Sequence, residues 1–159
     1  MQTIVKKERY KMIEHETEMK LATSLVLMDV IDKMLSSSDN LPFRLKYRLT
    51  RTSEQLRHDY EKYNSACLYL KAHYGKPNEA NTDVVLDDIA KENYNKAVNN
   101  ILMSTVSHKL FTVEPDDLDT IKSIIDIPVD ELRTFTAIMT NDETLQNEVE
   151  NEIKLTQGE

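Results

Sequence analysis

The stretch from Leu41 to Tyr74, "LPFRLKYRLTRTSEQLRHDYEKYNSACLYLKAHY", sets the architecture of this chain of 159 residues. Mostly apolar side chains recur along it every three or four residues, which is the spacing of one face of an α-helix. These positions are Leu45, Leu49, Thr52, Leu56, Tyr60, Tyr63, Cys67, Leu70 and Tyr74. Asn40 as N-cap and Pro42 in the first turn suit a helix start, and Gly75 suits its end. The pattern predicts one long helix of roughly 45–50 Å that forms the spine of the domain.

The composition favours one mainly helical domain. The chain has only 2 Gly and 4 Pro, and all-β folds need many turns that contain these residues. A single cysteine, Cys67, cannot form an internal disulfide and suits a reducing compartment. The longest uncharged apolar run, "LATSLVLM" (21–28), is too short to cross a bilayer, and no apolar region of a secretory signal follows the basic N-terminus. We therefore expect no membrane partner.

The segments on either side of the spine alternate between strand and helix patterns. Residues 13–21, "IEHETEMKL", alternate strictly and predict a half-buried strand with Ile13, His15 and Thr17 on its inner face. A helix then opens at residue 22 or 23. After the spine, residues 76–83 predict a loop, and "VVL" (84–86) a short strand. Further elements are a helix capped by Asp87 or Asp88, a strand at 108–113, a short helix around 118–125 and a helix from near Pro128.

These elements predict a mainly α fold with a small β-sheet, of the α+β class, in which the helix at about 41–74 packs with two to four shorter helices. Residues 1–140 are expected to form a single helical domain with the small sheet. Residues 141–159 form an acidic amphipathic segment that is expected to be separable from that domain. Leu145, Val149 and Ile153 follow one another at a spacing of four and are candidate partner-binding residues.

Charge is distributed unevenly between the two halves of the chain. Residues 1–76 carry 14 Lys and Arg and 10 Asp and Glu, a net of +4, whereas residues 77–159 carry 6 and 18, a net of −12. This polarity suits head-to-tail contacts in a homo-oligomer or a basic partner for the second half. An acidic surface that only provides solubility is the alternative.

The motifs that could carry chemistry are incomplete. "HETE" (15–18) lacks the second histidine of the helical zinc motif, because Met19 stands in its place, and on a strand His15 and Glu16 point to opposite faces. The acidic run "EPDDLDTIKSIID" (114–126) lacks the glycine of a calcium loop. Neither a Gly-rich phosphate loop nor a serine elbow is present. We expect no catalytic residue, no metal site and no cofactor, and hence no enzyme.

Basic residues gather in the first half of the predicted spine. Arg44, Arg48 and Arg51 follow at spacings of four and three and form one stripe, while Lys46 and Arg57 fall on the opposite flank. The three arginines are candidate partner-binding residues, because guanidinium groups hold carboxylates and phosphates in bidentate fashion. Their counterpart is either another protein, the phosphate backbone of nucleic acid or the acidic half of this chain, unless the stripe is merely solvated. A nucleic-acid partner is disfavoured, since the patch is sparse and the domain is acidic.

The order of elements, together with "LPFRLKYRL" (41–49) and "HYGKPNE" (73–79), resembles a family of small uncharacterised accessory and structural proteins of tailed bacteriophages. The resemblance covers roughly residues 12–139. Pro128 and Asn81 depart from the family pattern, both at turns. The resemblance implies a phage origin and a noncatalytic role in or around the virion, and it implies no site residues.

Two functions follow as hypotheses. In the first, the chain is a virion-associated structural or assembly component that docks on a larger complex of phage structural proteins. In the second, it is a phage-encoded regulator that binds and inhibits a host protein, with the acidic half as a mimic of nucleic acid. The expected location is the virion or the host cytoplasm.

Overall fold

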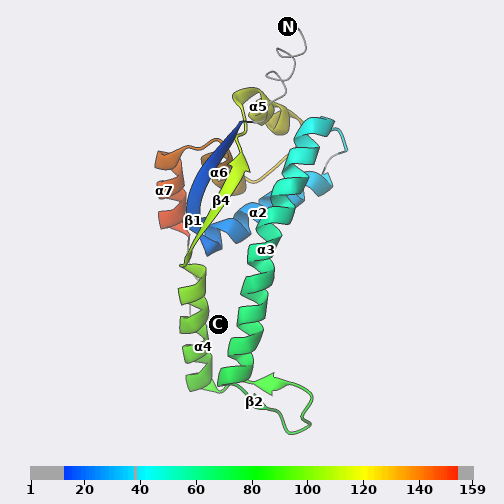
Figure 1. Ribbon diagram of the computed structural model, residues 1–159. Helices are drawn as coiled ribbons and strands as arrows, with labels where there is room; N and C mark the ends of the chain where they lie inside the picture. The colour runs from blue at the N-terminus through cyan, green and yellow to red at the C-terminus, as the bar shows by residue number, and fades with distance from the viewer. Residues whose placement is uncertain (1–12, 38, 154–159) are drawn as a thin grey trace.

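The computed structural model describes residues 13–37 and 39–153, which form a head and a projecting arm (Figure 1). The head contains β1 (Glu14–Lys20), α2 (Leu21–Ser37), the first half of α3 (Phe43–Tyr74), β4 (Thr105–Phe111), α5 (Pro115–Ile124), α6 (Val129–Met139) and α7 (Glu143–Glu152). The arm contains the second half of α3, the two-residue strands β2 (Lys76–Pro77) and β3 (Val84–Val85), and α4 (Asp88–Leu102). The predicted fold class, mainly α with a small β component, is confirmed.

The long spine helix is also confirmed, with a different start. Pro42 is the N-cap residue, with an extended ψ of 138°, so that α3 begins at Phe43 and Asn40 is not the cap. The amide of Gly75 donates to the carbonyl of Lys71 at 2.9 Å and closes the helix as predicted. All buried residues of α3 lie in its first half, ending at Leu56. Beyond that point the helix leaves the head, so the predicted stripe continues into the arm without becoming buried.

The most deeply buried helix is α2 and not the spine. Leu21, Met28 and Ile31, which lie on one face at spacings of three and four, are buried, but Leu27, Val30 and Met34 are equally enclosed. The reason is its position, because α2 packs against α3 on one side and α6 on another, and also contacts β1 and β4. Apolar residues at spacings of three and four indicate a helix with one covered face, whereas α2 is covered on several faces.

The main sheet consists of β1 and β4, which pair antiparallel from Glu14 opposite Phe111 to Lys20 opposite Thr105. The predicted alternation of β1 is confirmed, since Thr17 and Met19 are buried and Glu16 and Glu18 are exposed. Ile13 was expected inside, but it precedes the strand and is 60% exposed. The second strand begins at Thr105, three residues before the predicted start, because pairing with β1 extends it towards α4.

The tip of the arm is a hairpin inside the predicted loop. Lys76 and Pro77 pair antiparallel with Val85 and Val84, so "VVL" is a strand only in its first two residues. The side-chain oxygen of Asn78 accepts from the amide of Thr82 at 2.9 Å and fixes the turn between the strands. Such side-chain bonds to nearby backbone amides stabilise turns.

The predicted start of α4 is confirmed by its cap, whereas α5 begins at Pro115, three residues before the predicted start. The Asp87 carboxylate accepts from the amide of Ala90 at 2.8 Å at the start of α4. Glu114 and Asp117 form a reciprocal capping box at the start of α5. No helix within the described residues is long and apolar enough to cross a membrane.

A cluster of two tyrosines and the single cysteine lies between the helices of the arm. Tyr63 and Cys67 on α3 face Tyr94 on α4. Partial burial, together with a hydrogen bond to Cys67, raises the pKa of Tyr63 to about 12. Burial, reinforced by Cys67, raises the pKa of Tyr94 in the same direction. Both hydroxyl groups are thus held in their protonated form.

This cluster predicts a loss of stability at alkaline pH. The pKa of Tyr63 is about 12 in the folded chain, above the ordinary value of 10.0, so between these values the unfolded chain loses the proton first. The free energy of unfolding therefore falls as the pH rises through this window. In an absorbance titration of phenolate, Tyr63→Phe should remove the step at highest pH, whereas Tyr69→Phe, at a 69% exposed position, should leave it in place. A final step unaffected by Tyr63→Phe contradicts the prediction.

Candidate protein-docking surface

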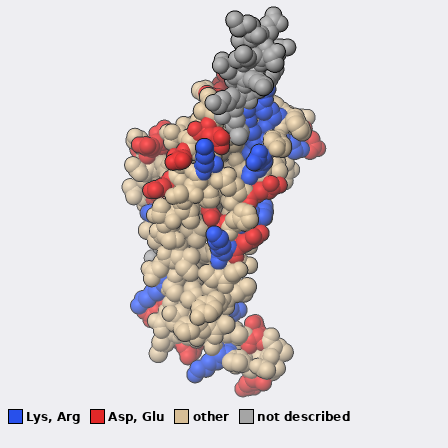
Figure 2. All heavy atoms as spheres, in the orientation of Figure 1, with Lys and Arg blue, Asp and Glu red and all other residues tan. Residues whose placement is uncertain are grey.

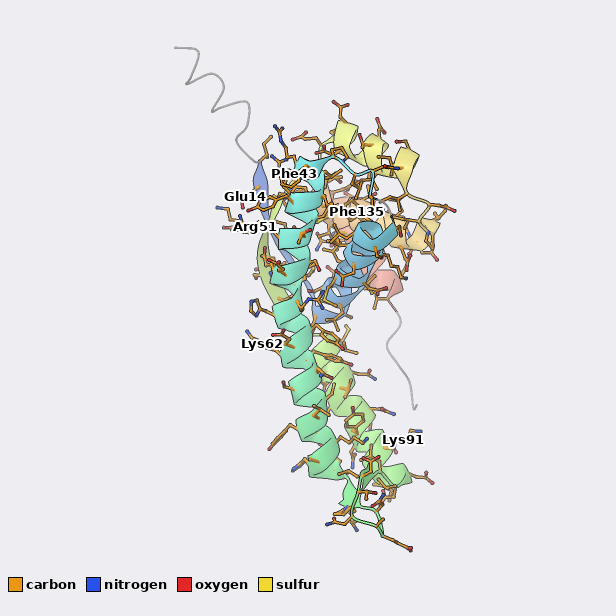
Figure 3. All side chains as sticks on the ribbon, turned by 90° about the vertical axis from the view of Figure 1, so that its right-hand side faces the viewer. Glu14, Phe43, Arg51, Lys62, Lys91 and Phe135 are labelled. Carbon is orange, nitrogen blue, oxygen red and sulfur yellow. The ribbon has the colours of Figure 1, made fainter. Side chains whose placement is uncertain are left out.

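The first two turns of α3 carry a surface of aromatic and arginine side chains, here called the aromatic–arginine face. Its members are Phe43, Arg44, Tyr47, Arg48 and Arg51. Phe43 is 82% exposed and Tyr47 is 53% exposed, which places two large apolar rings in solvent. Figure 3 shows Phe43 and Arg51 near Glu14 at the end of the molecule opposite the arm.

The side chains of this face are ordered by stacking. The rings of Phe43 and Tyr47 lie 6.3 Å apart between centroids with an interplanar angle of 21°. The guanidinium carbon of Arg51 lies 5.9 Å from the centroid of Tyr47, so the three side chains form a ladder at a spacing of four residues. Arg48 lies 5.9 Å from the ring of Phe111 on β4. The ladder presents its apolar and cationic groups in a fixed arrangement without covering them.

The acidic second half of the chain leaves two of the three predicted arginines, Arg48 and Arg51, without a carboxylate partner among the described residues. Their guanidinium groups lie over aromatic rings. Carboxylates of the second half pair with other cations instead. Glu131 bonds Lys33, while Glu148 and Glu152 bond Arg133 at 2.9 and 2.5 Å.

The candidate residues of the C-terminal segment lie elsewhere. Val149 on α7 is 5% exposed and belongs to the core of the head, and Leu145 packs against that core. Ile153 follows the end of α7 and is half-buried. The structure therefore does not bring these residues together with the arginine stripe. Residues 154–159 of the predicted segment lie outside the described residues.

Two polar side chains fasten α7 to the head. The amide nitrogen of Gln146 donates to the carbonyl of Glu18 at 2.6 Å. The Glu150 carboxylate accepts from the amide of Lys20 at 2.8 Å and from the hydroxyl of Thr23 at 3.1 Å. Glu150 thus caps the start of α2 from another helix, where a negative charge is favourable. That residues 141–159 are separable stays a prediction.

A buried polar network that sequence reasoning missed joins three elements of the head. The Asp59 carboxylate on α3 accepts from the hydroxyl of Ser24 on α2 at 2.8 Å and from Nε2 of His108 on β4 at 2.6 Å. The side chains of His108 and Asp59 are only 10% and 12% exposed, and Ser24 is fully buried. No local signal marks the network, because its members are 35 and 49 residues apart in sequence.

The order of groups in this network does not suit nucleophilic catalysis. In a serine triad the imidazole lies between the hydroxyl and the carboxylate, so that it can take the hydroxyl proton. Here the carboxylate of Asp59 lies in the middle, and Ser24 has no surface that a substrate could reach. The network is a structural link between α2, α3 and β4.

Gln55 fixes the tautomer of His108. Its side-chain nitrogen donates to the carbonyl of Lys109 at 3.3 Å, which sets the orientation of the amide. The same nitrogen lies 3.1 Å from Nδ1 of His108, which must therefore accept. The proton of the neutral ring then sits on Nε2, in position to donate to Asp59.

His15 has the inward position that the strand pattern predicts. Its Nε2 donates to the carbonyl of Ile138 at 2.8 Å, and its Nδ1 lies 2.7 Å from the hydroxyl of Thr112. Both ring nitrogens are bonded to protein groups. Over residues 13–37 and 39–153, no three or more His, Cys, Asp or Glu side chains are placed to hold a metal ion.

Comparison of the chain with protein-family models, with curated proteins and with solved structures finds no match in any of the three.

Proposed function

We propose that this chain is a noncatalytic phage protein that docks on a larger protein complex as a virion-associated structural or assembly component. The aromatic–arginine face is the observation that carries the proposal. The sequence resemblance to accessory proteins of tailed bacteriophages supports the phage setting. The buried position and the order of Ser24, Asp59 and His108 support a noncatalytic role.

The composition of the face favours a protein partner with an acidic surface. Tyrosine and arginine are enriched among the residues that contribute most to protein interfaces, and rigid aromatic side chains lose little entropy on binding. An apolar ring as exposed as that of Phe43 gains free energy when it enters a pocket. Arg48 and Arg51 then meet carboxylates around that pocket, because no acid of the described chain pairs with them. A net charge of −8 disfavours nucleic acid as the partner.

Quantification of the chain in purified virions tests this function. The wild-type chain should copurify with particles at a fixed copy number and cross-link to one structural protein. The double variant Phe43→Ala/Arg51→Ala should reduce incorporation about tenfold or more, because it removes both ends of the stacked ladder. Lys91→Ala on α4 is the matched control, since it removes one positive charge at the other end of the molecule, as Figure 3 shows.

Two other outcomes direct the assignment elsewhere. If the chain is absent from purified particles and its acidic surface retains a host protein, the second hypothesis, an inhibitor of a host protein, is favoured. A pocket of about 320 Å³ between β1 and α7, with Glu16, Glu18, Glu143 and Glu150 in its lining, is the surface that would act in that case. A steeply salt-dependent shift of DNA or RNA that Arg48→Glu abolishes indicates nucleic-acid binding instead.

A further inference from the structure

The arm has too little interior to cover its own apolar surface. On α4 only Asn95 and Val98 are buried, and no apolar residue of α3 beyond Leu56 is buried. Leu68 is 62% exposed and Tyr69 is 69% exposed. Two helices side by side leave their outer faces in solvent, and the arm stands clear of the head (Figure 1).

The outer surface of α3 in the arm is also poor in charge. The eight residues from Tyr63 to Leu70 carry none, in a chain that is 30% charged. Figure 2 shows the face of the arm on which α3 and α4 lie side by side, and the middle of the arm is largely uncharged there, whereas acidic and basic atoms gather on the head and at the tip. An exposed helix that only faces solvent ordinarily carries charges along its length.

One stripe of this surface has the spacing of a helix-pairing seam. Glu61, Asn64, Leu68 and Lys71 follow at intervals of three, four and three residues, and we call these four residues the seam. The seam lies about 100° around α3 from the stripe of Tyr63 and Cys67 that faces α4. Its two charged ends have only weak partners, because Glu61 lies 4.0 Å from His58 and Lys71 lies 3.9 Å from Asp83.

We propose that a second copy of this chain packs antiparallel along the seam, so that two arms pair side by side. With Asn64 of one copy opposite Leu68 of the other, Glu61 falls opposite Lys71 at both ends of the contact. A parallel pair would instead place like charges opposite each other, which is unfavourable. The charges of the seam therefore select both the partner and its direction, and the contact is isologous as a two-fold dimer requires.

The geometry of the arm accommodates this pairing. The two-fold axis passes near residue 66, about 12 Å along the helix from both His58 and Tyr74. Each arm thus reaches the base of the other, with the heads at opposite ends. The contact spans about 15 Å of one helix, so its area falls in the small class below about 1,200 Å² in total. Interfaces of that size are weak, and the dimer is expected to form in a concentration-dependent manner.

Sedimentation equilibrium of the full chain, up to roughly 1 mM, tests the proposal. The wild type should show a concentration-dependent monomer–dimer equilibrium. Leu68→Glu should raise the dissociation constant about tenfold or more, because it places a charge at the centre of the uncharged contact. Asn93→Glu adds the same charge on an exposed position of α4 and should leave the constant unchanged. Circular dichroism confirms that each variant is folded.

Charge reversal tests the antiparallel direction. Glu61→Lys alone and Lys71→Glu alone should each weaken the dimer, and the double variant should restore it, because the opposed pairs are re-formed with their signs exchanged. A monomer at all concentrations, a dimer insensitive to Leu68→Glu, or a double variant no better than the singles overturns the proposal. Because the seam and the aromatic–arginine face are separate, virion incorporation and dimerisation succeed or fail independently.

Discussion

Replacement of Asp59 by alanine is expected to lower the free energy of unfolding by about 2–4 kcal/mol. The carboxylate accepts from Ser24 at 2.8 Å and from His108 at 2.6 Å, and the three side chains are nearly excluded from solvent. Alanine leaves a buried hydroxyl and a buried imidazole without their acceptor, and each unsatisfied group costs about 1–3 kcal/mol. The variant also lacks the two hydrogen bonds through which Asp59 joins α3 to α2 and to β4.

Urea unfolding followed by circular dichroism measures this effect. Glu54→Ala is the matched control, because it removes a carboxylate from an exposed position on the same helix and should change the free energy by no more than about 0.5 kcal/mol. If Asp59→Ala proves as mild as this control, the network does not hold the three elements together in solution.

Replacement of Val149 by aspartate is expected to destabilise the chain by about 3–5 kcal/mol. Val149 is 5% exposed in the core of the head. The variant loses apolar burial and places a carboxylate in the core, and Arg133, which lines a pocket together with Val149, is already paired with Glu148 and Glu152. If α7 can leave the head, it undocks and the loss is limited to its docking free energy.

The same measurement thus decides whether residues 141–159 are separable. Asn147→Asp is the control, because Asn147 is an exposed neighbour on α7. If Val149→Asp lowers the free energy of unfolding by no more than this control, α7 contributes little to the stability of the head. A loss of several kcal/mol together with a single cooperative transition would show that α7 is an integral part of the domain.

The candidate site could be predicted only in part. The stripe of Arg44, Arg48 and Arg51 follows from helical spacing, because positions four and three residues apart are neighbours on any helix. The stacked ladder of Phe43, Tyr47 and Arg51 obeys the same spacing. Its exposure does not follow from the sequence, because an apolar ring on an amphipathic helix is as readily placed in a core. Only the position of α3 at the edge of the head leaves Phe43 uncovered.

The sequence by itself determined the local elements: the strand at 14–20, the length of the spine and the cap at Asp87. Periodicity and capping depend on residues within one or two turns, so they can be read without the fold. Tertiary structure alone decided that α2 is the enclosed helix, that α7 packs on the head and that Asp59 meets Ser24 and His108. These features depend on contacts between residues tens of positions apart, for which a single sequence carries no local signal.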